Sequence, residues 1–148
     1  MRPSNWDLQL PGQAKAILVD LDGTLALRQG RSPYDWDSVL DDDVNDAVVA
    51  VVRAVADAGY AIVVVSGRDE VCRDSSVQWL DQYLSRPYAL LMRAHGDNRR
   101  DEVVKSEMWQ AVQAQGYDVR MAFDDRNRCV DLWRSLGIPT FQVAEGDF

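Results

Sequence analysis

Two aspartates follow a short apolar run near the start of the chain, and something must balance their charge. Asp20 and Asp22 stand two residues apart, and Gly23 and Thr24 come directly after them. Carboxylates this close repel each other, so the arrangement costs stability unless a cation lies nearby. One carboxylate of such a pair can attack phosphorus, and the other can move a proton to or from an alcohol or water. The pair therefore predicts phosphoryl chemistry, and the alternative is a plain turn with a capping aspartate.

Further polar residues stand at the ends of the other apolar runs. Ser66 follows the run 60–65, and Lys105 lies near the start of a helical pattern. Ligands of parallel α/β sheets bind beyond the carboxyl ends of the strands, so these side chains are expected to meet at one edge. A hard divalent cation such as Mg²⁺ would hold carboxylates there, and cationic and hydroxyl groups would hold a phosphate. The other residues at predicted strand ends are Gly67, Arg68, Arg93, Asp124, Asp125 and Arg126.

The elements that must position these residues alternate along the chain. Apolar runs predict strands, and amphipathic stretches between them predict helices. The alternation predicts an α/β fold, a parallel sheet with helices on both faces, and leaves the strand order open. The predicted strands cover 15–19, 60–65, 88–94, 118–123 and 139–144. The predicted helices cover 41–59, 70–84, 101–116 and 127–137, the first of them beginning with Asp41, Asp42 and Asp43.

Length, charge and hydropathy limit the class of protein. The 148 residues make one ordinary domain, expected at 15–148 after an amino-terminal arm or linker remnant at 1–14. A net charge of −8 argues against a protein that coats nucleic acid with its whole surface, but leaves room for a local basic site. No apolar run nears the ~20 residues of a membrane span, and the start lacks the apolar stretch of a secretion signal. We therefore expect a cytoplasmic protein with no membrane partner.

Several strings in the sequence are similar to those of a known enzyme family. ILVDLDGTL, VVVSGRD, Lys105 and FDDR resemble the four motifs of the haloacid-dehalogenase-like (HAD-like) phosphohydrolases. The longer strings GRSPYDW, MRAHGDNRRDEVVKSE, FDDRNRCVDLWRSLGI and FQVAEGDF resemble the 3′-phosphatase domain of bacteriophage polynucleotide kinase-phosphatases. The resemblance runs from about Ile17 to Phe148 and implies a Rossmann-like, HAD-like sheet. The kinase part of that family carries a P-loop, GxxxxGK[ST], which this sequence lacks, so kinase activity is not predicted.

The resemblance also implies roles for individual residues. Asp20 would be the nucleophile, Asp22 the general acid and base, and Lys105 the cation beside the phosphoryl group. Mg²⁺ would be the cofactor, held by Asp20, Asp124, Asp125 and, through its backbone, Asp22. The residues implied to contact the phosphate or the rest of the substrate are Thr24, Arg31, Ser66, Gly67, Arg68, Arg93 and Arg126.

The spacing of the motifs bears on the substrate. The stretches from Asp20 to Ser66 and from Ser66 to Lys105 are too short for a large cap domain. An open site suits a bulky substrate such as a nucleic-acid end, where Tyr34 and Trp36 would either stack a terminal base or pack their own loop. Together with the resemblance, this predicts hydrolysis of a terminal 3′-phosphate of DNA or RNA during end healing. The sequence leaves open whether a separate kinase or ligase acts beside the chain as a partner.

Two other functions stay open on the residues alone. One is a small-molecule phosphatase such as a nucleotidase, against which the missing cap argues. The other is a non-catalytic module that binds phosphorylated ends, against which the complete set of Asp20, Asp22, Lys105 and Asp124 argues, because binding needs no nucleophile.

Overall fold

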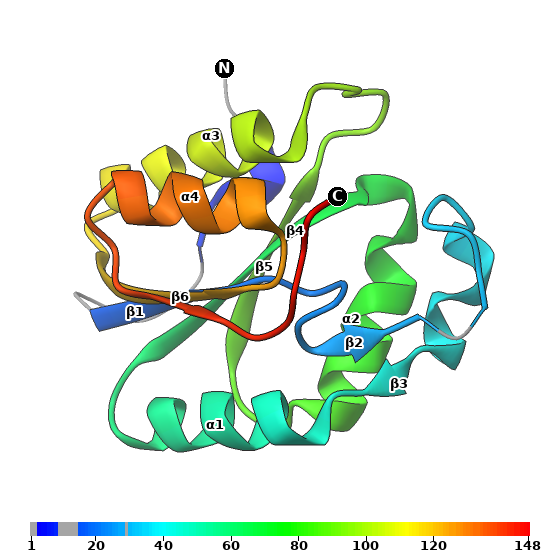
Figure 1. Ribbon diagram of the computed structural model, residues 1–148, viewed down its shortest axis with the longest axis horizontal. Helices are drawn as coiled ribbons and strands as arrows, with labels where there is room; N and C mark the ends of the chain where they lie inside the picture. Colours follow the sequence, from blue (N-terminus) through cyan, green and yellow to red (C-terminus); the bar gives the residue numbers. More distant parts are fainter. Residues whose placement is uncertain (1–2, 9–14, 29) are drawn as a thin grey trace.

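The fold centres on one parallel sheet, seen in a computed structural model that describes residues 3–8, 15–28 and 30–148 (Figure 1). The sheet has five strands in the order β5-β4-β1-β6-β7. β1, the first strand of the chain, lies at its centre, where Ile17 is level with Ile62 on one side and Met121 on the other. The strands are β1 (Lys15–Val19), β4 (Ala61–Asp69), β5 (Tyr88–Arg93), β6 (Asp118–Asp124) and β7 (Thr140–Gln142).

Helices cover both faces of this sheet (Figure 1). Successive side chains of a strand point to opposite faces, so the apolar runs supply two separate cores. Ile17 and Val19 pack with the helices α1 (Asp46–Asp57) and α2 (Arg73–Tyr83). Leu18 packs on the other face with α3 (Asp101–Ala114) and α4 (Asn127–Ser135). The predicted α/β fold with helices on both faces is confirmed.

A small insertion follows β1 and stands beside the carboxyl edge of the sheet. It contains a two-stranded antiparallel ribbon, β2 (Ala26–Leu27) with β3 (Asp43–Val44), and a 3-10 helix, η2 (Trp36–Asp41). Among the described residues no cap domain follows β1 or β4, as the motif spacing predicts.

The predicted helix at 41–59 is wrong at its start, because α1 begins only at Asp46. Asp41 ends η2, and Asp43 belongs to β3. Asp42 is buried, and its carbonyl oxygen accepts a hydrogen bond of 3.0 Å from Nε1 of Trp79. The contact draws Asp42 into the interior and away from the solvated first turn that a helix start would need, while Asp41 and Asp43 stay exposed.

The other boundaries differ from prediction by a few residues. β4 runs on to Asp69, whose carboxylate then accepts from the backbone N–H of Val71 and begins the 3-10 helix η3 (Glu70–Cys72). The predicted helix at 70–84 is therefore η3 followed by α2. Strand β7 is shorter than the predicted 139–144.

Part of the predicted arm at 1–14 packs against the domain. Ser4–Trp6 form a 3-10 helix, η1, and Trp6 is buried in the core below α3. Its Nε1 donates a hydrogen bond of 2.8 Å to the carbonyl oxygen of Met92. Residues 1–2 and 9–14 lie outside the described residues.

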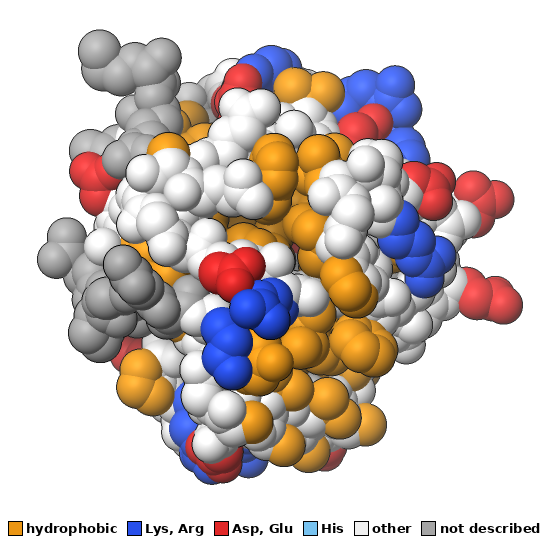
Figure 2. Space-filling model, turned by 90° about the vertical axis from the view of Figure 1, so that its left-hand side faces the viewer, with side chains coloured by type: hydrophobic (Ala, Val, Ile, Leu, Met, Phe, Trp, Pro, Cys, Tyr) orange, Lys and Arg blue, Asp and Glu red, His pale blue; other side chains and the backbone are white. Residues whose placement is uncertain are grey.

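The surface is uneven in character. The side shown in Figure 2 carries apolar side chains across much of its centre, with few charged ones among them. The cleft at the carboxyl edge of the sheet is instead lined mostly by charged residues. In the described part of the chain, no helix is both long and apolar enough to cross a membrane.

Candidate active site

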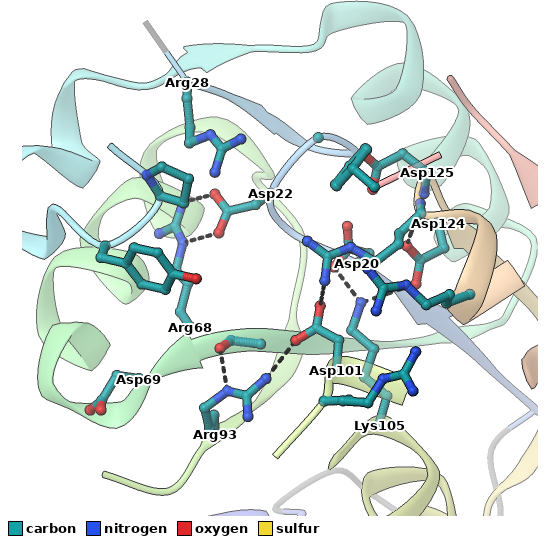
Figure 3. A pocket seen from close by; sticks show the side chains of 18 of the residues that line it. Asp20, Asp22, Arg28, Arg68, Asp69, Arg93, Asp101, Lys105, Asp124 and Asp125 are labelled. Atoms are coloured by element: carbon teal, nitrogen blue, oxygen red, sulfur yellow. Dashed lines mark hydrogen bonds and ion pairs between the residues drawn. The ribbon is translucent and has the colours of Figure 1, made fainter. Parts of the chain in front are cut away.

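A cleft of about 770 Å³ opens where the strands end, and acidic and basic side chains line it together (Figure 3). β1, β4 and β6 all end at its floor. Its acidic residues are Asp20, Asp22, Asp69, Asp97, Asp101, Asp124 and Asp125. Its basic residues are Arg28, Arg68, Arg93, Arg99, Arg100, Lys105, Arg126 and Arg128.

Three buried carboxylates form the centre of the cleft. Asp20, Asp124 and Asp125 each offer an oxygen, and these oxygens lie within 4.8 Å of one another. Lys105 reaches the group from α3, with its Nζ 2.7 Å from Oδ1 of Asp20 and 3.0 Å from Oδ2 of Asp124. One ammonium faces three carboxylates, which leaves an excess of negative charge. All-oxygen donors with excess negative charge fit a hard divalent cation such as Mg²⁺.

Neighbouring groups hold each of these carboxylates in place. Thr24 Oγ1 donates to Oδ2 of Asp20 at 3.0 Å, and Trp133 Nε1 donates to Oδ2 of Asp124 at 3.1 Å. Gly23 has a φ of +83°, and a Cβ at this position would lie 2.1 Å from Oδ2 of Asp125. The turn after Asp20 therefore requires glycine both for its backbone angle and for the close approach of Asp125.

The surroundings of two carboxylates at the centre, Asp20 and Asp125, disfavour their negative charge. Burial raises the pKa of Asp20 well above its usual range, and the Asp124 carboxylate raises it further, although Lys105 opposes both. Burial also raises the pKa of Asp125. Burial alone would lower the pKa of Lys105, but Asp124 and Asp20 outweigh it and raise that pKa, so the ammonium stays charged. Bound protons or a bound cation would relieve the carboxylate repulsion.

Asp22 lies apart from this centre, on the side of Arg68 (Figure 3). Two arginines, Arg68 and Arg31, hold its carboxylate. Arg68 donates to it through Nε at 2.9 Å and Nη2 at 2.8 Å, and Arg31 donates through Nη2 at 3.1 Å. Both arginines also bind the buried Asp42, at 2.9 Å and 2.7 Å. The Asp22 side chain keeps 28% of its surface exposed and lines the cleft, so it is oriented but accessible.

This geometry makes Asp42 a positioning residue for Asp22, and a substitution tests it. Asp42→Asn should lower kcat for phosphate release about tenfold while leaving KM within about twofold, because Asp42 holds the arginines and lies outside the cleft lining. The free energy of unfolding should fall by about 1–3 kcal/mol, since buried Arg68 loses a charged partner. Steady-state kinetics and urea unfolding measure both. An equal loss in the exposed control Asp43→Asn would contradict the role.

A second acidic residue, Asp101, gathers two other arginines. Its Oδ1 lies 2.6 Å from Nη2 of Arg93, and its Oδ2 lies 3.2 Å from Nη1 of Arg126. Although burial opposes the change, Lys105, Arg126 and Arg93 together lower the pKa of Asp101. A Cβ on Gly67 would come within 2.2 Å of Oδ1 of Asp101, so this arrangement excludes a side chain at position 67. Arg93 also donates to the carbonyl oxygen of Gly67 at 2.8 Å.

Most of the residues singled out in the sequence come together here, although three do not line the cleft. Arg31 and Thr24 lie behind Asp22 and Asp20, to which they donate. Ser66 is buried, and its hydroxyl accepts from the backbone N–H of Arg68 at 3.1 Å. The cleft is lined by the other predicted residues, which are Asp20, Asp22, Gly67, Arg68, Arg93, Lys105, Asp124, Asp125 and Arg126.

Asp101 and Asp42, the two acidic residues that hold the arginines around the centre, were not predicted from the sequence. Asp101 precedes Lys105 by four residues, a spacing that places both on one face of a helix, and this signal could have found it. Asp42 stands in a run of three aspartates, and nothing in the run distinguishes the buried member from its solvated neighbours.

Comparisons with known proteins agree with the geometry. The family model for the polynucleotide kinase PNKP phosphatase domain matches residues 14–148. A protein of Autographa californica nuclear polyhedrosis virus, described as a bifunctional polynucleotide kinase/RNA ligase, is 34% identical over 146 residues, which are 95% of this chain and 21% of the relative.

Solved structures agree as well. A chain in a structure of a Pnkp1/Rnl/Hen1 complex is 37% identical with a TM-score of 0.86, over 97% of this chain and 50% of that one. A chain in a Pnkp1/Rnl/Hen1 RNA repair complex is 36% identical with a TM-score of 0.86, and the match covers 100% of this chain and 48% of that one. The fold is shared with the class C acid phosphatase of Bacillus anthracis, which is 17% identical with a TM-score of 0.62. That match covers 80% of this chain and 54% of the acid phosphatase chain.

The chain thus spans about a fifth of its viral relative and about half of each chain in the two complexes. The family match covers every element of the sheet and every charged residue of the cleft. The chain belongs to the family of polynucleotide kinase PNKP phosphatase domains, phosphomonoesterases with a HAD-like fold.

Proposed function

We propose that this chain is a Mg²⁺-dependent polynucleotide 3′-phosphatase that removes the terminal 3′-phosphate of a DNA or RNA strand and leaves a 3′-hydroxyl. One observation carries the proposal most directly. A buried carboxylate, Asp20, is aligned by Lys105 and Thr24 at the floor of an open cleft, and a second carboxylate, Asp22, is held separately in the same cleft. A nucleophile and a proton carrier need this separation of roles.

The residues support two chemical steps. In the first, a carboxylate oxygen of Asp20 forms a bond to phosphorus while the bond from phosphorus to the 3′-oxygen breaks, and Asp22 gives a proton to that oxygen. In the second, water attacks phosphorus and the acyl-phosphate P–O bond breaks. Asp22 takes the proton of the water, and the Asp20 carboxylate is restored. Arg68 and Arg31 keep Asp22 aimed during both proton transfers.

The charged neighbours serve the phosphoryl group. Lys105 offers a buried positive charge beside Asp20 for the phosphoryl oxygens. Mg²⁺ would be held by Asp20, Asp124 and Asp125, where it would offset the charge between these carboxylates and the phosphate. We further propose that the backbone of Asp22 contributes one more ligand to Mg²⁺.

The choice of a polynucleotide rests on the open cleft and on the relatives. No cap among the described residues closes the cleft over a small substrate. The viral relative is described as a kinase and RNA ligase, and one structural relative is part of an RNA repair complex. We propose that this chain acts on 3′ ends in nucleic-acid repair, with a kinase or ligase as its partner.

Phosphate release from matched oligonucleotides tests this function. The panel contains DNA and RNA with a 3′-phosphate, DNA with a 5′-phosphate, and a free 3′-mononucleotide, each with Mg²⁺ and with a chelator. Release from the 3′-phosphorylated strands alone, and only with Mg²⁺, is the expected result. Activity confined to the mononucleotide would indicate a nucleotidase. No release from any substrate would indicate a module that only binds ends.

The stabilising effect of Mg²⁺ should depend on pH. The pKa values of Asp20 and Asp125 are raised in the metal-free folded protein. Between the ordinary pKa of Asp and these raised values, the folded protein therefore holds protons that the unfolded chain has released. Stability from this source is complete below the ordinary pKa of Asp and is lost as the pH rises through the raised values. Mg²⁺ replaces these protons, so it should raise Tm by about 5 °C near pH 8 and far less near pH 5.

Scanning calorimetry with Mg²⁺ or a chelator at several pH values measures this difference. Asp125→Asn should remove most of the pH-dependent rise, whereas the exposed control Asp131→Asn should keep it. A rise of equal size at every pH would show that the cation binds away from the carboxylates at the centre of the cleft.

A further inference from the structure

The arginines of the cleft fall into two groups by what they bind. Among the described residues seven arginines line the cleft, and five of them form an ion pair with a carboxylate of the protein. Arg99, for example, is bound by both Asp97 and Glu107. The charge of these five is already balanced, which weakens their attraction for an added anion. The five are Arg68, Arg93, Arg99, Arg100 and Arg126.

The other two, Arg28 and Arg128, have no carboxylate partner among the described residues. Both are exposed. Arg28 follows β2 and lies on the side of Asp22 (Figure 3), whereas Arg128 stands in the first turn of α4, the helix that follows Asp124 and Asp125 in the chain. They therefore flank the centre of the cleft from two sides. In a chain with a net charge of −8, two uncompensated cations at the mouth of one cleft mark a place for an anionic ligand.

We propose that Arg28 and Arg128 bind the internucleotide phosphates of the strand that ends in the cleft. The proposal rests on the 3′-phosphatase function proposed above. The terminal phosphate occupies the centre beside Lys105, so it cannot also neutralise the two outer arginines. The next phosphates toward the 5′ end are the nearest anions that every polynucleotide carries. The two arginines thereby make the site selective for a single strand with a 3′-phosphate over a free 3′-mononucleotide, whatever its base sequence.

Two aromatic residues that line the same cleft suit the same ligand. Tyr34 is 81% exposed and lines the cleft, as does the half-exposed Phe148. The Tyr34 ring is accessible to a nucleobase on a strand that passes the two arginines, whereas the guanidinium of Arg126 already lies 4.8 Å from the centre of the Phe148 ring. Such stacking would accept any base, in agreement with contacts that address only the sugar-phosphate chain.

The test compares thymidine 3′-monophosphate, thymidine 3′,5′-bisphosphate and a short oligothymidylate with a 3′-phosphate. With the unaltered protein, KM should fall from the monophosphate to the oligonucleotide. Arg28→Ala and Arg128→Ala should each raise KM for the oligonucleotide about threefold or more at low salt, with KM for the monophosphate and kcat unchanged. The slope of log(1/KM) against log[salt] should become shallower by about 0.7 for each phosphate contact removed.

Arg99→Ala is the matched control, because Arg99 lines the same cleft, is exposed, and is bound by Asp97 and Glu107. It should leave the salt dependence unchanged. If the unaltered protein releases phosphate from oligonucleotides but both variants keep its salt slope, the proposed contacts are wrong and the proposed function stands. If the unaltered protein releases no phosphate from any of the three compounds, the proposed function itself fails. If all three variants changed KM for the oligonucleotide and its salt dependence equally, the positive charge of the whole cleft would attract the strand, and the specific contacts of Arg28 and Arg128 would be wrong.

Discussion

Asp20→Asn is expected to reduce kcat for phosphate release by about 10⁴-fold or more while the protein stays folded. The amide keeps the shape of the side chain but cannot form a bond to phosphorus as a carboxylate does. The fold should tolerate the change because Lys105 keeps Asp124 as a partner at 3.0 Å. Burial and Asp124 already disfavour the charged form of Asp20, so its neutral replacement removes a repulsion from the metal-free protein.

Initial rates of phosphate release and thermal unfolding in chelator measure the two parts of this expectation. Tm should not fall, and the far-ultraviolet circular dichroism should be unchanged. The exposed aspartate Asp131 gives the control, and Asp131→Asn should keep full activity. Activity of Asp20→Asn within tenfold of the unaltered protein would show that another group attacks phosphorus.

Lys105→Met should have the largest effect on stability. Lys105 is 1% exposed and is the shared partner of Asp20 and Asp124, so its loss leaves buried carboxylates without a cation. Breaking a buried ion pair from one side costs about 3–5 kcal/mol, and we expect a loss of this size in urea unfolding with chelator. The raised pKa of Asp20 means that the loss should shrink as the pH falls and the carboxylates bind protons. Phosphate release should fall about 10²- to 10³-fold.

Three comparisons make the Lys105 prediction specific. Mg²⁺ should restore part of the lost stability, because it supplies positive charge to the same carboxylates. The double variant Asp20→Asn with Lys105→Met should be more stable than the sum of the single effects predicts, as expected for residues in contact. The only other lysine, Lys15, is exposed and lies over the ring of Tyr60, so Lys15→Met should cost less than about 1 kcal/mol. Equal losses at the two lysines would contradict the account.

The strands of the fold could be predicted because each is a short apolar run with a distinct end. β1 covers the predicted residues, and β6 differs only at its last residue. The strand order could not be predicted, because hydrophobic patterns are local and say nothing about which strands pair. The start of α1 was misplaced because a run of aspartates is typical of a helix start, and only the tertiary contact between Asp42 and Trp79 moves it elsewhere.

The residues of the site were predictable where position along a strand determines position in space. Asp20 follows β1 and Asp124 ends the neighbouring parallel strand β6, so their meeting follows from the sheet. The roles of the arginines were not predictable in this way. Contact of Arg31 and Arg68 with substrate stays a prediction, and the structure adds their ion pairs with Asp22 and Asp42, which no sequence pattern indicates. Pairing of this kind depends on three-dimensional distances that the order of residues does not contain.

The central place of β1 has a consequence for how the chain is made. Residues 15–19 are synthesised before the two strands that flank them, β4 and β6, which end at residues 69 and 124. Until the second of these has emerged, one edge of an almost wholly apolar strand has no hydrogen-bonding partner. The nascent chain is therefore exposed to aggregation between the synthesis of β1 and that of β6, and we expect its yield of native protein to depend on chaperones and on the speed of translation.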